Sequence, residues 1–204
     1  MNQSIRVDIK TSQKIKQLGW FISNYSNIFN DSFIYLYFYH IPVEALDFST
    51  VKTNKVKSII FQNLLNPFTV EEIRNLEVFN SIVVPFKNKM PESLLKVFIS
   101  NLDKIRDKSK IICQIDSSNF DEFEKIGRVV KFCLSCKFFK FSISGFSAKS
   151  TEAIKIFIER NGGSIEILPK DIKYQIDEQG NILNPKTKQT LSTIYKYPGF
   201  LIFN

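Results

Sequence analysis

The sequence predicts an α/β protein: a mixed sheet flanked by helices, followed by a smaller α/β segment with a hairpin-rich C-terminal tail. Three observations support this prediction. Residues 32–116 contain four runs dominated by apolar, β-branched and aromatic residues, as in buried strands. Segments with helical spacing lie between these runs, and no glycine occurs in this stretch. Such an alternation of strand and helix implies a sheet covered by helices.

Local signals place the elements that precede residue 128. Thr11 or Ser12 can cap a helix with apolar residues at helical spacing. Pro91 suits the first position of a helix that continues to Asp107. In chain order we expect a helix over 11–29, a strand over 33–41, a helical segment over 43–55, a strand over 57–65, a short helix over 69–79, a strand over 82–86, a helix over 91–107, a strand over 111–115 and a short acidic helix over 118–127.

The remaining elements follow a long apolar run. Val129–Ser144 has the pattern of a strand. Ser147 is placed to cap a helix over 148–161, and Asn161-Gly162-Gly163 can end that helix with a left-handed residue.

The last part of the chain is rich in turn residues. A strand over 164–168 is followed by the turn sequences Asp177–Gly180 and Asn184–Thr187, which predict hairpins. We therefore expect two domains, an α/β RNA-binding domain over 1–127 and a smaller α/β segment with a hairpin tail over 128–204.

Composition favours a polyanionic partner. The 204 residues carry a formal net charge of +8, and 44% of them are hydrophobic, enough for a sizeable core. No apolar run reaches the roughly 18–20 residues that a membrane-spanning helix needs, so we expect no membrane contact. Met1–Lys16 contains Asp8 and no long apolar run, unlike a secretory signal or a transit peptide.

Lysine clusters at the ends of predicted elements are the candidate RNA-binding residues. Lysines in such places contact phosphates without reading bases. The alternative is a solvated surface that reflects only the lysine bias of the chain. The candidates are Lys10, Lys14, Lys16, Lys52, Lys55, Lys57, Lys104, Arg106, Lys108 and Lys110.

The other reactive side chains favour structural interpretations. Cys133 and Cys136 have the spacing of half a zinc site or of a redox pair. A second half of a zinc site is missing and the pair lies in an apolar run, so we interpret them as strand cysteines. His40 is interpreted as a strand-end histidine, and the acidic cluster Asp121, Glu122 and Glu124 as a solvated face. We expect no catalytic residue, metal, cofactor or small-molecule substrate.

Tyr35, Tyr37 and Tyr39 share one face of a predicted strand. They could form a stacking platform for bases, but packing within the sheet is the favoured interpretation.

Residues 12–116 resemble the large-subunit ribosomal protein ten family, the rRNA-binding base of the stalk. The resemblance lies in the order FIYLYFYHI, IIFQNLL, LEVFNSIVVPFKN, PESLLKVFISNLDKI and KIICQI. Where that family has Val-Val-Lys-Asn-Thr/Ser-Leu, this chain has Ile60–Leu64 and keeps the Asn as Asn63. For the family's Leu-x-x-x-Phe-x-Gly-Pro motif this chain has Leu76, Phe79, Asn80 and Ser81, and the Gly-Pro is lost. The family's C-terminal helix, which recruits stalk proteins, is not evident here.

Arg128–Leu168 is similar to the end of large-subunit ribosomal protein fifteen. That family has a Val-Lys-Val-Leu strand, a Phe-Ser helix start and a Gly-Gly-x-Val-Glu-Val segment after the helix. This chain has Val130-Lys131-Phe132, Phe146-Ser147 and Gly162–Ile167 in these places.

The two resemblances imply the same machine. We therefore expect a structural constituent of an organellar large ribosomal subunit, located in the mitochondrial matrix, with rRNA and other ribosomal proteins as partners. The alternatives are a non-catalytic assembly or protein-binding subunit of another organellar or viral complex, and an enzyme of a type the sequence does not reveal.

Overall fold

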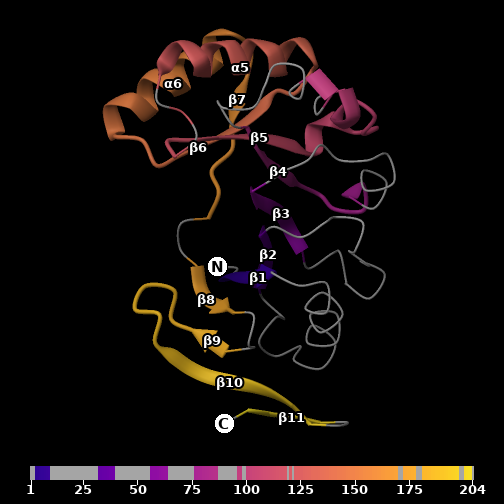
Figure 1. The fold of residues 1–204 in the computed structure, drawn as a ribbon, viewed down its shortest axis with the longest axis vertical. Coiled ribbons are helices and arrows are strands. Elements are labelled where there is room, and N and C mark those ends of the chain that lie inside the picture. Colours follow the sequence, from indigo (N-terminus) through magenta and orange to yellow (C-terminus); the bar gives the residue numbers. More distant parts are fainter. Residues whose placement is uncertain are drawn as a thin grey trace. The chain divides into compact units, whose positions relative to one another are not determined.

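The computed structural model describes residues 3–9, 32–39, 56–63, 76–86, 96–97, 100–118, 120, 122–169, 172–177, 181–197 and 200–203. These residues form a mixed α/β fold, which confirms the predicted class (Figure 1). The chain divides into two compact units. The first unit comprises Met1–Ile60 and Pro169–Asn204, and the second comprises Phe61–Leu168.

The first unit contains a mixed sheet in the order β11-β10-β9-β8-β1-β2. Strand β1 is parallel to both β2 and β8, whereas the neighbours β8–β9, β9–β10 and β10–β11 are antiparallel. The predicted hairpin tail is therefore confirmed. The strands are β1 (Gln3–Ile9), β2 (Ser32–Tyr39), β8 (Ile172–Ile176), β9 (Asn181–Leu183), β10 (Thr190–Tyr197) and β11 (Phe200–Phe203).

Strand β1 was not expected from the sequence. Ile5, Val7 and Ile9 are fully buried, and they alternate with Arg6 and Asp8 on the other face of the strand. Because β1 lies between β8 and β2, it joins the two ends of the chain into one unit. The period-two pattern is short and lies at the start of the chain, so it did not predict a strand.

Strands β2 and β3 (Val56–Asn63) confirm two of the predicted strands within the described residues. Both are buried on both faces, as Ile34 and Tyr35 in β2 and Ile59 and Ile60 in β3 illustrate. This burial explains their nearly continuous apolar sequence. The predicted helices over 11–29 and 43–55, and most of the one over 69–79, lie outside the described residues. Of the helix over 91–107, residues 96–97 and 100–102 are helical.

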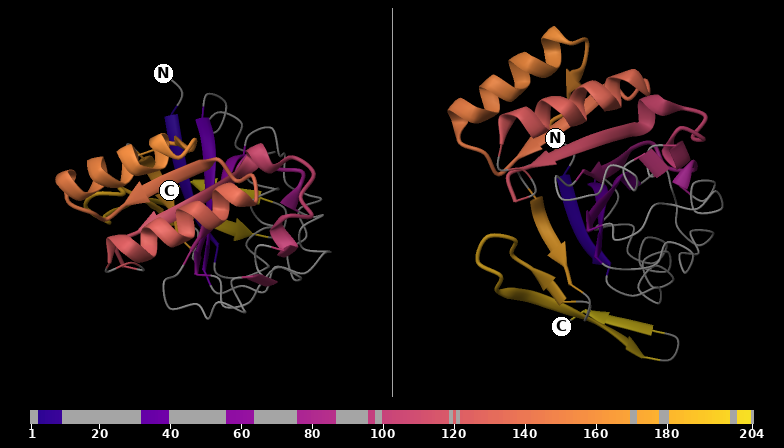
Figure 2. Two further views of the ribbon diagram at one scale, coloured as in Figure 1. Left: turned by 90° about the horizontal axis from the view of Figure 1, so that it is seen from above. Right: turned by 45° about the horizontal axis from the view of Figure 1, so that its top comes forward.

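The second unit contains parallel strands in the order β4-β5-β6-β7. Its strands are β4 (Ile82–Pro85), β5 (Ile111–Asp116), β6 (Lys140–Ser144) and β7 (Ser164–Ile165), with the 3-10 helix η3 (Lys108–Lys110) before β5. Helices α5 (Phe123–Ser135) and α6 (Ala148–Arg160) lie side by side over the same face of β5–β7 (Figures 1 and 2). Phe123 and Phe157 join the two helices edge to face, with ring centroids 5.7 Å apart.

Helix α5 corrects two predictions. The acidic helix over 118–127 is confirmed only from Phe123 onward, where α5 begins. The long strand over 129–144 is wrong over 129–135, which belong to α5, and only its end, Lys140–Ser144, is a strand, β6. Ile126, Val129, Val130 and Cys133 are buried at positions i, i+3, i+4 and i+7, which form one helical stripe. The β-branched side chains of Val129 and Val130 contributed to the strand-like composition of the run, but the spacing of the four residues is that of a helix.

Helix α6 confirms its predicted caps. The Ser147 side chain accepts a hydrogen bond from the Ser150 backbone N–H, and Gly162 has φ +88° just after the helix. The Gly163 N–H then donates to the Ile158 carbonyl over 3.0 Å. Strand β7 is shorter than the predicted strand over 164–168.

The compact units do not follow the expected division at residue 127. That position lies inside α5, and the chain from Pro169 to Asn204 belongs to the first unit. Pairing of β8 with β1 accounts for this arrangement, because it attaches the C-terminal strands to the N-terminal one.

Candidate functional site

Half of the predicted RNA-binding residues lie in the described part of the chain. Lys10, Lys14, Lys16, Lys52 and Lys55 lie outside the described residues. Lys57 lies on β3, and its exposed side chain places Nζ 5.5 Å from the centre of the Phe33 ring. The other four described candidates, here called the basic junction, precede β5 in the second unit: Lys104, Arg106, Lys108 and Lys110.

Two residues of the basic junction make contacts within the protein. Lys110 Nζ donates to the Glu77 carbonyl oxygen over 2.7 Å. Lys108 forms an ion pair with Asp103, and its Nζ lies 6.0 Å from the centre of the Phe138 ring. These contacts fasten the segment to the second unit.

The other two residues of the junction present exposed side chains. Lys104 Nζ makes a long hydrogen bond of 3.3 Å to the Asn101 side chain. The Arg106 backbone N–H donates to a Glu77 carboxylate oxygen over 2.9 Å, so the backbone of this exposed residue is fixed. Lys104 and Arg106 are thus the members of the junction best placed to meet an external anion.

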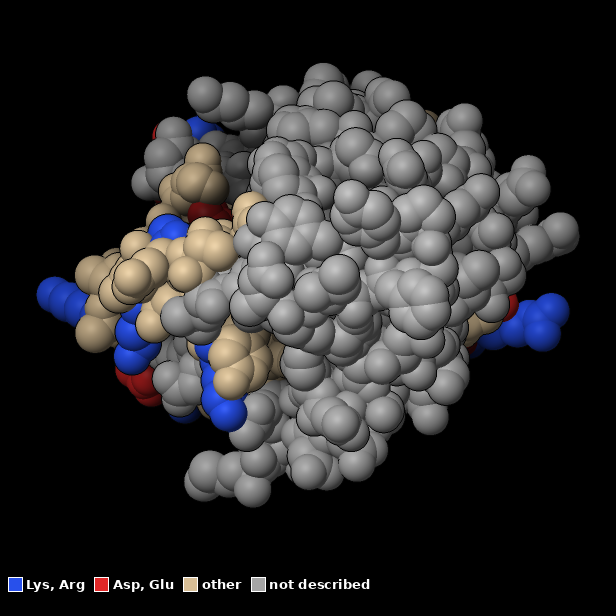
Figure 3. Space-filling view, turned by 90° about the horizontal axis from the view of Figure 1, so that it is seen from below, with Lys and Arg blue, Asp and Glu red and all other residues tan. Residues whose placement is uncertain are grey.

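Acidic residues lie within the basic junction and elsewhere in the second unit. Asp107 lies within the junction, and Glu166 pairs with Lys140 at 3.4 Å. Hydrogen bonds from the Ser109 hydroxyl and backbone N–H lower the pKa of Asp107, and the charges of Lys110 and Lys140 add to the effect. On the face shown in Figure 3, described Asp and Glu side chains likewise lie beside several Lys and Arg side chains.

A second group of polar residues lies on the sheet of the second unit. Cys113 of β5 contacts Cys133 of α5, so alternate residues of β5 point away from the helices. Register places Gln114 beside Ser142 and Asp116 beside Ser144. Gln114, Asp116, Ser142 and Ser144 therefore share the face opposite α5 and α6, here called the polar face of β5–β6.

Asp116 organises one end of the polar face. Its Oδ1 accepts from the Ser118 backbone N–H over 2.8 Å and the Ser118 hydroxyl over 2.5 Å, and Oδ2 accepts from the Ser144 hydroxyl over 2.5 Å. Burial raises the pKa of Asp116, but these hydrogen bonds outweigh it, so the pKa lies below its ordinary value. Asp116 is therefore ionised near neutral pH and acts as an acceptor.

Ser142 occupies the middle of the polar face. Its side chain is 3% exposed, and its Oγ has no hydrogen-bond partner. A buried hydroxyl without a partner is uncommon in native proteins, and it marks this position as one where water or a bound group could be accommodated.

The three cysteines of the chain lie in the second unit. Cys133 is inside α5 and Cys136 caps its C-terminal end, so the prediction of strand cysteines is wrong. The Cys113 thiol is buried and hydrogen-bonded to Cys133, and its pKa is raised well above the ordinary value, chiefly by burial. Among the described residues, no group of three or more His, Cys, Asp or Glu side chains is arranged to hold a metal ion.

The acidic cluster lies where the sequence suggested a solvated face. Glu124 pairs with Arg128 at 2.5 Å and Glu122 with Lys125 at 2.9 Å on exposed parts of α5 and its start. Asp121 and His40 lie outside the described residues.

Two of the three residues of the predicted tyrosine face contribute to packing, and the side chain of the third, Tyr39, lies outside the described part of the chain. Tyr35 and Tyr37 are buried in β2, and the Arg6 guanidinium lies 4.0 Å from the centre of the Tyr37 ring. Burial raises the pKa of Tyr35, while a hydrogen bond with Ser4 opposes this effect.

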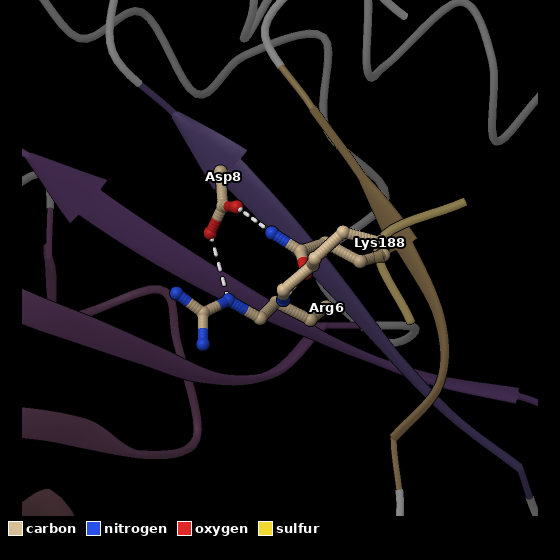
Figure 4. A network of polar contacts seen from close by, with 4 residues as sticks. Arg6, Asp8 and Lys188 are labelled. Carbon is tan, nitrogen blue, oxygen red and sulfur yellow. Dashed lines mark hydrogen bonds and ion pairs between the residues drawn. The ribbon is translucent and has the colours of Figure 1, made fainter. Parts of the chain in front are cut away.

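Sequence reasoning missed a polar network in the first unit. Asp8 Oδ1 accepts from Arg6 Nε over 2.8 Å and Oδ2 accepts from Gln175 Nε2 over 2.5 Å (Figure 4). Lys188 Nζ in turn donates to Gln175 Oε1 over 2.6 Å. The signal was the alternation of Arg6 and Asp8 with Ile5 and Val7, but nothing in the sequence indicated that β8 lies alongside.

Comparisons with known proteins add no family. No protein-family model matches the sequence, and no curated protein matches it significantly. Within the described residues, no helix has the length and apolar character required to cross a membrane.

Proposed function

We propose that this protein is a non-catalytic structural component of an organellar large ribosomal subunit, in the mitochondrion, and that it binds the backbone of rRNA. The net charge of +8 supports an anionic partner, and the likeness of residues 12–116 to the stalk-base family supports the ribosome. The observation that carries the proposal is the basic junction. It offers two exposed cations on a backbone that Glu77 and Lys110 hold in place.

Such a junction suits contact with phosphates rather than bases. Lys104 and Arg106 emerge from an irregular segment, not from a helix or ribbon shaped to enter a groove. Cations in this arrangement neutralise phosphates and release counterions, so affinity falls steeply with salt. Other ribosomal proteins would be the further partners.

Sedimentation tests the ribosomal assignment. The native protein, followed in a mitochondrial lysate, is expected in large-subunit fractions at moderate salt. Its absence from those fractions, with known large-subunit proteins present, would reject the proposal.

A matched pair of variants tests the basic junction. Lys104→Gln with Arg106→Gln should reduce the log–log salt slope for binding to large-subunit rRNA fragments by about 1.4 to 1.8 units. Lys131→Gln with Lys149→Gln removes the same charge from exposed positions on α5 and α6 and should leave the slope unchanged. Equal effects of the two pairs would mean that net charge, and not the junction, governs binding.

A second candidate is a protein-binding or assembly subunit of another organellar or viral complex. The polar face of β5–β6 favours it, because strands hold its hydrogen-bonding groups rigidly and none of its four residues is a cation. This candidate predicts a protein that co-purifies with the wild type in the absence of RNA. Gln114→Ala with Ser144→Ala should release that protein, while the Lys104 and Arg106 variant should retain it.

A further inference from the structure

The fold gathers all three cysteines of this chain around one end of helix α5. Cys113 is fully buried on β5, Cys133 is fully buried in the last turn of α5, and Cys136 is partly exposed at its C-cap. The sequence separates Cys113 from the other two by 20 residues or more, so only the packing of α5 on β5 brings them together.

We infer that Cys133 and Cys136 form an oxidisable dithiol that hydroperoxides convert to an intramolecular disulfide. This inference is independent of the proposed function. It rests on the difference in exposure within the cluster: Cys136 is partly exposed and can meet a reagent from solvent, whereas Cys133 is fully buried.

The spacing of Cys133 and Cys136 along the helix is compatible with a disulfide. Residues i and i+3 of an α-helix have Cα atoms about 5 Å apart, inside the range of about 4.4–6.8 Å found across disulfides. The helix also ends here. The Cys136 N–H donates to the carbonyls of Phe132 and Cys133, and the next residue, Lys137, has φ 65°. Cys136 thus lies at the boundary of the regular helix, where the backbone can adjust more readily than in its interior.

Cys113 is placed as a neighbour and not as the first thiol to react. It is fully buried, and burial raises its pKa, so it stays a protonated thiol at neutral pH. Its hydrogen bond with Cys133 holds the two side chains together on the inner side of the helix.

The reaction has two steps. The Cys136 thiolate attacks a hydroperoxide: an S–O bond forms, the O–O bond breaks, and the alcohol or water leaves, giving a sulfenic acid. The Cys133 sulfur then attacks the Cys136 sulfur: the S–S bond forms, the S–O bond breaks, and the hydroxyl leaves as water with the Cys133 proton. Two thiols are oxidised by two electrons in total, and one hydroperoxide is reduced.

Trypsin provides a direct readout in the full-length protein. Cleavage after Lys131 and Lys137 gives a single peptide, Phe132–Lys137, that contains both Cys133 and Cys136, while Cys113 falls in Ile111–Lys125. After treatment with hydrogen peroxide and alkylation of the remaining thiols, we expect an unalkylated Phe132–Lys137 peptide two hydrogen masses lighter than the dithiol form. The Cys113 peptide should be fully alkylated.

Two variants locate the reacting groups. Cys136→Ser, at a partly exposed position, should reduce disulfide formation to background. Cys113→Ala, in protein shown by circular dichroism to be folded, should retain at least half of the wild-type yield. A cross-link between Phe132–Lys137 and Ile111–Lys125, or a Cys136 oxidised to sulfinic acid beside an alkylated Cys133, would overturn the inference.

Discussion

Some residues in this protein make contacts with residues far away in the sequence, and their neighbours along the chain do not indicate these contacts. Asp8 is 6% exposed and accepts hydrogen bonds from Arg6 on its own strand and from Gln175, which is 167 positions away. A buried carboxylate is stable only when its oxygens are satisfied. The network therefore ties β1 to β8, and through Lys188 to the turn between β9 and β10.

We predict that Asp8→Ala lowers the free energy of unfolding by about 2 kcal/mol, because it leaves the partly buried Arg6 and the buried Gln175 without their acceptor. Denaturant unfolding followed by circular dichroism measures this change. Glu166→Ala, which removes a half-exposed partner of Lys140, is the comparison and should cost less than about 0.5 kcal/mol. A cost for Asp8→Ala no larger than that of Glu166→Ala would show that the network does not stabilise the fold.

Asp116 gives the second unit a dependence on acid. Its pKa in the folded protein lies below the ordinary value of 3.8. The stabilisation that results is complete above that ordinary value and is lost as the pH falls through the lower folded value. NMR titration of the Asp116 carboxyl carbon should therefore give a midpoint below 3.8 in the wild type.

The serine hydroxyls should cause this shift. Ser118→Ala and Ser144→Ala each remove one donor, so each should raise the Asp116 midpoint towards or above 3.8, because the burial that opposes the shift remains. A midpoint that does not move in either variant would assign the low pKa to another cause.

At the scale of elements, the composition of a segment and the spacing of its apolar residues did not predict structure equally well. Strands β2, β3 and β4 were predictable because strands buried on both faces are nearly continuously apolar, and β5 because its apolar residues Ile111–Cys113 and Ile115 outnumber its polar ones. The same composition misled at α5, where only the spacing of Ile126, Val130 and Cys133 distinguishes a helix. Helix α6 was predictable from its ends, since Ser147 and Gly162 have local roles that do not depend on the rest of the fold.

Two glycines in the second unit allow the cost of backbone strain to be compared with the cost of a steric contact. Gly145 has φ +77° and Gly162 has φ +88°, conformations that cost a residue with a Cβ about 1–2 kcal/mol. A Cβ at Gly162 would meet nothing within 4 Å, whereas a Cβ at Gly145 would lie 2.3 Å from the Ser117 hydroxyl oxygen.

We therefore predict that Gly162→Ala costs about 1 kcal/mol of unfolding free energy, after allowing for the stiffer unfolded chain. Gly145→Ala should cost more, because Ser117 must also move. Thermal or denaturant unfolding compares the two. On a Ser117→Ala background the added cost of Gly145→Ala should shrink, and an unchanged cost would mean that the contact with Ser117 does not matter.

At the scale of the whole molecule, the sequence indicated the class of the fold but not its division into units. Residue 127 was a plausible boundary while Val129–Ser144 was interpreted as the start of a second sheet. Pairing of β1 with β8 is a contact between distant residues, and no local pattern predicts it. For the same reason the candidate residues could be chosen by their charge, but the sequence could not show which of them are exposed and which make contacts within the protein. Lys110 looked equivalent to Lys104 until its bond to Glu77 was known.

Two groups of cations can be compared by their contribution to salt-dependent RNA binding. The first is the basic junction, and the second comprises Lys14, Lys16, Lys55 and Lys57, of which Lys57 is described and exposed. Each phosphate neutralised adds about 0.7–0.9 to the log–log slope of affinity against salt. Changing Lys14, Lys16, Lys55 and Lys57 together to Gln should therefore flatten the slope for large-subunit rRNA fragments by about two to four units.

The fold should survive this change, because surface substitutions usually alter stability by no more than about 0.5 kcal/mol each. Circular dichroism and the unfolding midpoint are the controls. If both groups contact the same RNA at separate places, combining the four substitutions with Lys104→Gln and Arg106→Gln should reduce the slope by the sum of the separate effects. An unchanged slope in the quadruple variant, with a reduced slope in the Lys104 and Arg106 variant, would confine RNA binding to the basic junction. Unchanged slopes in both variants would contradict the RNA-binding proposal.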